Sequence, residues 1–168
     1  GKKLDILDFT VGTKISGSGF PFYKGKGAIL ERALINFMLD SQRQNGYTEV
    51  GVPYLVNRES MEAAEKVPKF EEDMYRTEPD DLFAIPTAEV PIVNIHRDEM
   101  LDPNALPIKY CGYTACFRRE AGSWGAHVRG LNRLHQFDKV EIVQIRKPED
   151  SYQALDEMCT YVQSLLEK

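Results

Sequence analysis

The sequence lacks the features of membrane-spanning and exported proteins. None of its apolar runs approaches the roughly 20 residues that a membrane-spanning helix needs, and the first residues contain no signal-peptide core. Cysteine is scarce, and Cys111, Cys116 and Cys159 form neither an even set nor a C-x-x-C pair. We therefore expect free thiols and a reducing compartment, the cytoplasm, with Cys111 and Cys116 as small buried residues.

A net positive charge is also missing, because 26 acidic residues outweigh 21 basic ones and leave a formal charge of −5. Such a surface does not attract long polyanions as a whole. Residues 118–139 reverse the balance, with five basic side chains against two acidic ones. This confined basic patch predicts a site for a small anion. His127 and His135 stand apart from other ligand types, so no metal site is expected there.

What is present fits one domain of mixed helices and strands. The 168 residues are 42% hydrophobic and 28% charged, without repeats or low-complexity segments. Periodicity and capping residues predict helices at 28–44, 58–66, 87–99 and 149–168. Strands are predicted at 47–52, 82–85, 108–119 and 131–145. Residues 1–27 are predicted as irregular chain with strand pieces, and residues 68–81 as a surface loop. The long strands look hairpin-linked, so we predict an α+β fold with a largely antiparallel sheet flanked by helices.

Two of the predicted helices have informative apolar patterns. The helix at 28–44 has apolar residues around more than one side, which indicates burial on more than one side. One side can pack on its own domain and the other on a partner subunit, and burial of the whole helix within one domain is an equal alternative. In the last helix, one face is expected to carry Leu155, Met158, Val162 and Leu165.

The two long strands each carry one polar face, because side chains alternate with period two. One face of the first strand has Thr114, Cys116, Arg118 and Glu120, and one face of the second has Arg133, His135, Phe137, Lys139 and Glu141. If these faces coincide, guanidinium groups can bind phosphate and Phe137 can stack on a base. The alternative is a solvated sheet face with cross-strand salt bridges, although Phe137 does not suit such a face. Gly122, Gly125 and Gly130 could let the connecting loop close over a ligand.

Four segments carry a family resemblance. TACFRRE at 114–120 resembles the second signature motif of class II aminoacyl-tRNA synthetases in its seryl form, and RGLNRLHQFDKVE at 129–141 is similar to the return strand of the seryl-tRNA synthetase family. IPTAE at 85–89 resembles the family's loop for the amino acid. The segment at about 28–53 resembles the first class II motif, which forms a dimer interface in that family, and the second motif spans about 114–141. Two features depart from the pattern: Arg119 stands where a small residue is frequent, and GAHVR at 125–129 replaces a more familiar run.

The resemblance implies a catalytic-core segment of an enzyme that activates serine with ATP and transfers it to tRNA(Ser). It implies ATP contacts from Arg118, Arg119, Glu120, Arg133 and Phe137, with Arg118 on the α-phosphate as the catalytic residue. It implies serine contacts from Thr87, Ala88, Glu89 and Glu141. Taken singly, Thr87 fits a helix cap, Glu89 a first-turn acid and Glu141 a salt-bridge partner of Lys139 or Arg133.

The resemblance covers less than half of a normal family chain. We expect the tRNA-binding arm and the third class II motif, with the main protein ligand for Mg²⁺, to lie outside these 168 residues, and the chain alone to be inactive or very weak. Homodimerisation is expected, and membrane association is not. The alternative function is that of a synthetase-like paralogue that binds an amino acid or nucleotide for regulation or carrier-protein loading.

Overall fold

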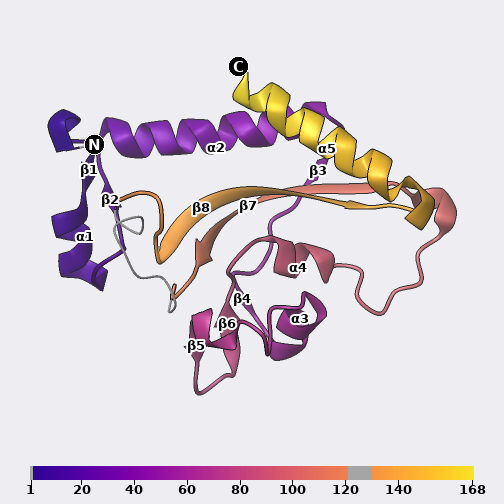
Figure 1. Ribbon diagram of the computed structural model, residues 1–168, viewed down its shortest axis with the longest axis horizontal. Helices are drawn as coiled ribbons and strands as arrows, with labels where there is room; N and C mark the ends of the chain where they lie inside the picture. The colour runs from indigo at the N-terminus through magenta and orange to yellow at the C-terminus, as the bar shows by residue number, and fades with distance from the viewer. Residues whose placement is uncertain (1, 121–129) are drawn as a thin grey trace.

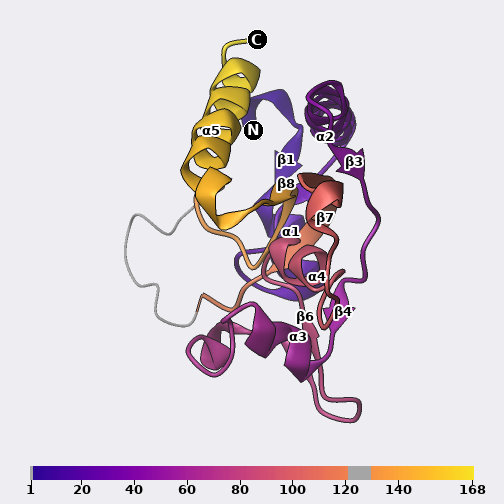
Figure 2. The same cartoon turned by 90° about the vertical axis from the view of Figure 1, so that its right-hand side faces the viewer.

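A computed structural model describes residues 2–120 and 130–168. The helices are α1 (Phe9–Ser16), α2 (Lys26–Gln44), α3 (Arg58–Ala63), α4 (Glu89–Val93) and α5 (Ser151–Leu166), with short 3₁₀ turns at Lys2–Leu4, Glu71–Asp73, Pro103–Ala105 and Pro148–Asp150. The strands are β1 (Leu7–Asp8), β2 (Phe22–Tyr23), β3 (Thr48–Glu49), β4 (Leu55–Val56), β5 (Arg76–Thr77), β6 (Leu82–Ala84), β7 (Ile108–Phe117) and β8 (Gln136–Ile145). Helices α2 and α5 lie on one side of the long β7–β8 hairpin, and α3, α4 and the small β4–β6–β5 sheet lie on the other (Figures 1 and 2).

The β7–β8 hairpin is antiparallel along its whole length, and β3 adds one short parallel pairing to β7. The register places Thr114 opposite Lys139 and Cys116 opposite Phe137. Paired residues share a face, so the two polar faces predicted from alternation coincide. We call this surface, with Thr114, Cys116, Phe137, Lys139 and Glu141, the site face. The prediction of an α+β fold with a largely antiparallel sheet is confirmed.

The opposite surface of the hairpin, which we call the helix face, packs against α2 and α5. The Lys109 ammonium lies 5.6 Å from the ring centre of Tyr47 and 5.5 Å from that of Tyr161 on α5. Gln144 Nε2 donates to Tyr47 Oη at 2.6 Å. These contacts hold α5 at the end of the hairpin that contains Lys109 and Gln144. The functional site lies at the other end.

The small antiparallel sheet and α3 enclose a separate apolar core. Its buried residues include Met61, Phe83, Ile85 and Val90. The Phe117 N–H donates to the Ile85 carbonyl at 2.9 Å, which joins this core to the end of β7. The connection between β6 and α4 is therefore held next to the end of β7 at Ile85.

The N-terminal segment differs from its prediction as irregular chain, because it contains α1. The Asp8 carboxylate caps this helix by accepting from the N–H groups of Thr10 and Val11 at 2.8 and 3.1 Å. Gly12 packs against the Phe20 carbonyl so closely that a Cβ atom would lie 1.8 Å from its oxygen. Glycine at this position permits close packing inside a helix, so the prediction of irregular chain was wrong for α1.

Several predicted boundaries were too long. The helix expected at 87–99 ends at Val93, where Asn94 Nδ2 donates to the carbonyls of Ser60 and Val90. The strand expected from residue 131 starts at Gln136, because the His135 N–H bonds outside the sheet to the Gly19 carbonyl at 3.0 Å. The strand expected at 47–52 shortens to β3, the helix at 58–66 ends at Ala63, and the loop at 68–81 contains β5.

The long helix α2 is not buried on all of its apolar sides within this chain, so the alternative of burial within one domain was wrong and contact with a partner subunit stays a prediction. Ile29, Leu30, Leu34 and Phe37 are between 41% and 57% exposed, although α2 also contacts β7 and β8. The apolar face predicted for α5 is covered only in part, since Leu155 and Val162 are exposed and the buried residue of α5 is Ala154.

Candidate active site

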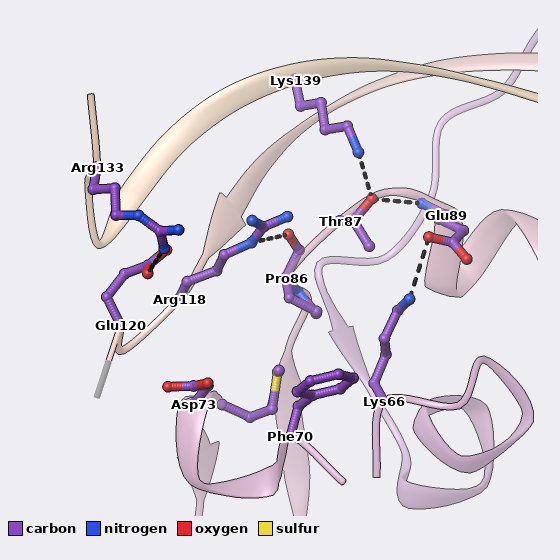
Figure 3. Close-up of a pocket in the computed structure, with 11 residues that line it drawn as sticks. Lys66, Phe70, Asp73, Pro86, Thr87, Glu89, Arg118, Glu120, Arg133 and Lys139 are labelled. Atoms are coloured by element: carbon purple, nitrogen blue, oxygen red, sulfur yellow. Dashed lines mark hydrogen bonds and ion pairs between the residues drawn. The ribbon is translucent and has the colours of Figure 1, made fainter. Parts of the chain in front are cut away.

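A cavity of about 340 Å³ lies between the site face and the β6–α4 connection (Figure 3). Its wall is formed by Lys66, Phe70, Asp73, Met74, Pro86, Thr87, Glu89, Arg118, Glu120, Arg133 and Lys139. These residues come from the loop after α3, from the β6–α4 connection and from the two strands of the hairpin with their extensions. Long polar side chains dominate the wall, which suits a charged ligand better than an apolar one.

Arg118 follows β7 and is held from three sides. Its backbone N–H donates to the His135 carbonyl at 2.9 Å, and its Nε donates to the Pro86 carbonyl at 3.2 Å. The centre of its guanidinium group lies 5.0 Å from the ring centre of Phe137. No carboxylate of the described residues forms an ion pair with Arg118, so its charge is available to an anion.

Glu120 and Arg133 form an ion pair at the outer end of the cavity. The Glu120 backbone has a φ of 53°, in the left-handed region that non-glycine residues seldom adopt. The neighbouring Arg119 N–H donates to the Asp73 carbonyl at 2.8 Å, which fixes the chain next to this turn. A second cavity of about 340 Å³ adjoins here, with Phe137 in its wall together with Arg118, Glu120 and Arg133.

Thr87 forms the centre of a polar cluster at the other end of the cavity. Its side chain is buried, and its hydroxyl donates to Glu141 Oε2 at 2.7 Å. The same hydroxyl accepts from Lys139 Nζ at 3.0 Å and from the Glu89 N–H at 3.3 Å. Lys139 Nζ also lies 2.5 Å from Glu141 Oε2. One donor and two acceptors are the full capacity of a hydroxyl, so Thr87 is saturated in this arrangement.

The simpler interpretations of these residues are also met in the structure. Thr87 accepts from the N–H of Glu89, the first residue of α4, as a capping residue would, although the cap position itself is Ala88. Glu89 lies in the first turn and forms an ion pair with Lys66 at 3.4 Å. Glu141 pairs with Lys139, as the salt-bridge alternative expected. These contacts are compatible with ligand binding, because each group also lies in or behind the cavity wall.

The predicted site residues gather in one region, with differences in detail. Thr87, Glu89, Arg118, Glu120 and Arg133 line the first cavity, as listed above, and Phe137 lines the adjoining one. Ala88 is fully buried, and neither Arg119 nor Glu141 belongs to the cavity wall. Gly122, Gly125 and His127 lie outside the described residues. The binding roles themselves stay predictions.

Arg133 and His135 were placed on the same strand face as Phe137, and this was wrong because both precede β8. The His135 ring stacks on Phe20 with a centroid distance of 5.3 Å, and its Nδ1 lies 2.9 Å from Tyr75 Oη. His135 therefore packs the N-terminal segment against the site. Arg133 still reaches Glu120 because the chain turns back after Gly130.

The sequence analysis missed several lining residues. Lys139 could have been assigned a role, because it shares the alternation of Phe137 and Glu141. Lys66, Phe70 and Asp73 come from a polar loop without periodicity, so no local pattern identifies them. The buried thiols agree with expectation: Cys111 and Cys116 are fully buried, and burial raises the pKa of both thiols, which lowers their reactivity.

The cavity thus combines an arginine stacked on an aromatic ring with a cluster of hydroxyl, ammonium and carboxylate groups. The first combination suits a nucleotide phosphate and base, and the second suits the polar groups of a small amino acid. Comparison with known families gives a match over residues 69–168 to "tRNA synthetase class II core domain (G, H, P, S and T)". The chain belongs to this family.

Individual relatives agree with the seryl form of this class II family. The chain is 60% identical over 168 residues to a serine–tRNA ligase of Chlorobium chlorochromatii and 57% identical over 166 residues to one of Akkermansia muciniphila. The match covers 99% and 98% of this chain, respectively, and 39% of each relative. The chain therefore spans about two fifths of the length of the curated relatives that it matches.

Solved structures give the same result for the fold. The seryl-tRNA synthetase of Pyrococcus horikoshii complexed with ATP aligns with a TM-score of 0.93 and 38% identity, over 99% of this chain and 37% of that one. The cytoplasmic serine–tRNA ligase of Naegleria fowleri in complex with AMP aligns with a TM-score of 0.90 and 33% identity, over 97% of this chain and 39% of that one. In the described part of the chain, no helix combines the length and apolar character needed to cross a membrane.

Proposed function

We propose that this chain is the catalytic-core segment of a longer protein that activates serine with ATP and transfers the seryl group to tRNA(Ser). One observation carries the proposal: Arg118, stacked on Phe137, shares a cavity with the Thr87–Lys139 cluster. If a nucleotide phosphate binds at Arg118 and an amino acid binds at the Thr87–Lys139 cluster, the carboxylate of the amino acid lies next to the α-phosphorus of the nucleotide. The relatives named serine–tRNA ligase and the neighbours with bound ATP or AMP support this substrate pair.

The first reaction would be attack of the serine carboxylate on the α-phosphorus, which forms seryl-adenylate and releases pyrophosphate. Negative charge builds on the α-phosphate oxygens during this step, and Arg118 is proposed to stabilise it. Phe137 would stack on adenine, Glu120 would accept from the adenine amino group, and Arg133 would lie near the nucleotide. Contacts of this kind position the reactants rather than form covalent bonds to them.

The serine end would use the β6–α4 connection and β8. Thr87, Ala88, Glu89 and Glu141 are proposed to hold the amino acid, and Lys66 already supplies Glu89 with an ammonium partner at 3.4 Å. An incoming α-ammonium group could take the place of Lys66, because this pair is long and the Glu89 side chain is 43% exposed. Exchange of one cation for another costs little when both sites are accessible to water.

Magnesium is proposed as the companion of ATP in the longer protein. Within the described residues, no three His, Cys, Asp or Glu side chains are grouped as metal ligands, so this chain does not fit a protein-bound metal by itself. We propose that the main protein ligand for Mg²⁺ lies in another segment of the longer protein. We also place the protein in the cytoplasm, where tRNA is charged.

A homodimer through α2 belongs to the same proposal. Ile29 and Phe37 of this helix remain exposed and lie outside the cavity between α2 and β8, whereas Leu30 and Leu34 line that cavity. A second copy of the chain would cover this surface in a twofold arrangement.

The test is serine-dependent ATP–pyrophosphate exchange by the longer protein, with alanine and threonine as competing substrates. Exchange that requires serine supports the proposal, and exchange with another amino acid only would overturn it. Nucleotide binding without any exchange would favour a regulatory or carrier-loading paralogue instead. The 168-residue chain should be assayed beside it, and we expect its exchange rate to be at least about 10²-fold lower, because preorganised charge is missing.

A further inference from the structure

Lys139 is the member of the polar cluster to which the proposed function assigns no role. It lies on the site face of β8, opposite Thr114, and lines the cavity. Figure 3 shows its side chain pointing from the strand toward Thr87. Its Nζ contacts Thr87 Oγ1 at 3.0 Å and Glu141 Oε2 at 2.5 Å, so two of its three N–H donors are used inside the protein.

Both contacts to the Glu141 carboxylate fall on the same oxygen. Thr87 donates to Oε2 at 2.7 Å, and Lys139 also approaches Oε2. Within the described residues, Oε1 forms no hydrogen bond or ion pair, and it is not among the buried atoms that lack a partner. The side chain is 18% exposed, so one oxygen is anchored and the other is accessible.

We propose that Lys139 is a specificity-determining positioning residue, which fixes Glu141 through Oε2 so that Oε1 is the acceptor for the amino-acid substrate. The inference rests on the proposed function. The Thr87 hydroxyl already uses its donor and both acceptor positions in this arrangement, so the open oxygen of Glu141 is the acceptor that the cluster offers to an arriving substrate. Anchoring it removes rotamer freedom before the substrate arrives, which raises affinity and selectivity without direct contact.

The nature of the lysine side chain is part of the inference. An ammonium group is a compact point charge that can bind one oxygen, whereas a guanidinium group has a planar fork that binds both oxygens of a carboxylate. Lys139→Arg would therefore keep the charge and cover Oε1 as well. Lys139→Met would keep the aliphatic stem and leave Glu141 Oε2 held by the Thr87 hydroxyl alone.

The experiment is serine-dependent ATP–pyrophosphate exchange in the longer protein with Lys139→Met, Lys139→Arg and, as matched control, Lys109→Met. Lys109 is the other lysine of the hairpin whose ammonium is held inside the fold, but it contacts Tyr47 and Tyr161 on the helix face. We expect both Lys139 variants to raise the KM for serine by about 10- to 100-fold, with the KM for ATP changed less than about twofold. Lys109→Met should leave both KM values unchanged and lower only the melting temperature.

Four outcomes would overturn the inference. Recovery of the serine KM in Lys139→Arg would show that charge alone matters. A lower serine KM in Lys139→Met would show that Lys139 competes with the substrate. An equal rise of the KM for serine and the KM for ATP would show a general structural role. No change in either KM would show that Lys139 has no role in binding. If Lys139→Met does not fold, Lys139→Arg decides the question. Failure of the proposed function is distinguishable, because then the unmodified protein shows no serine-dependent exchange.

Discussion

The site face and the helix face of the β7–β8 hairpin use alternate residues of the same strands, yet they hold their charges differently. On the site face, Arg118 lies against Phe137, and Lys139 bridges Thr87 and Glu141 at the wall of an open cavity. On the helix face, Asp138 meets Glu31 of α2 beside apolar side chains. Opposite charges lie together at the cavity wall of the site face, whereas two like charges lie next to each other on the helix face.

The Glu31 carboxyl of α2 faces Asp138 of the helix face. Burial, followed by the hydrogen bond to Asp138 and the charge of Asp138, raises the pKa of Glu31 to about 7. Tyr113 Oη donates to Asp138 Oδ1 at 2.5 Å, and burial together with Asp138 raises the pKa of this hydroxyl far above its ordinary value. The comparison indicates that site-face substitutions should change kinetics, whereas helix-face substitutions should change stability.

The largest effect is expected from Arg118→Ala in the longer protein. Loss of the cation proposed for the α-phosphate should lower kcat of exchange by about 10²- to 10³-fold. The matched control is Arg146→Ala, which removes an arginine paired with Glu157 of α5 and should lower the melting temperature with little change in kcat. A normal rate per folded molecule in Arg118→Ala would show that this arginine is structural and would break the comparison.

The next effect concerns the outer side of α2. Phe37 is 41% exposed, and Phe37→Glu would place a charge in the proposed dimer contact. We expect the dimer to weaken by about 100-fold or more, since an unpaired buried charge is costly, as measured by analytical ultracentrifugation. Leu166→Glu on α5 is the control, because Leu166 is 77% exposed and lies outside the proposed contact. A dimer that persists in Phe37→Glu, or an unmodified protein that is monomeric, would contradict the proposed interface.

Glu141→Ala should weaken serine binding by about 10- to 100-fold and ATP binding by much less. Isothermal titration calorimetry of the longer protein with each ligand measures both affinities. Glu157→Ala, which removes a carboxylate on the helix side of the fold, should leave both affinities unchanged. Equal losses for serine and ATP would show that Glu141 supports the whole cavity and not one end of it.

The smallest effect is a pH-dependent change in stability from Glu31→Gln. The folded chain holds the Glu31 proton up to about pH 7, while an unfolded chain releases it near the ordinary 4.5, so stability falls as pH rises between these values. The variant should therefore match the parent near pH 4.5 and exceed it above pH 7, by an amount on the order of 1 kcal/mol after allowance for solvent screening. Urea unfolding at pH 5 and pH 8 measures the difference in stability between the variant and the parent. An equal difference at both pH values would show that the pKa of Glu31 is not raised.

The sequence by itself determined those features that follow from the spacing of residues along a single strand or helix. The period-two pattern of Cys116, Phe137 and Glu141 predicted one shared face, and the register of the hairpin confirms it. The apolar residues around α2 left two alternatives open, burial within one domain or contact with a partner, and Ile29 and Phe37 are exposed in this chain. Periodicity is sufficient in these cases because neighbours along one strand or helix fix which way each side chain points.

Contacts between distant segments were decided by the tertiary structure alone. Lys66 meets Glu89, Arg118 meets the Pro86 carbonyl, and His135 leaves the predicted strand to stack on Phe20. The same holds for Glu141, whose two oxygens differ only because Thr87 and Lys139 converge on one of them. No local pattern encodes such differences, since they depend on how separate elements pack and which hydrogen-bonding groups that packing leaves accessible.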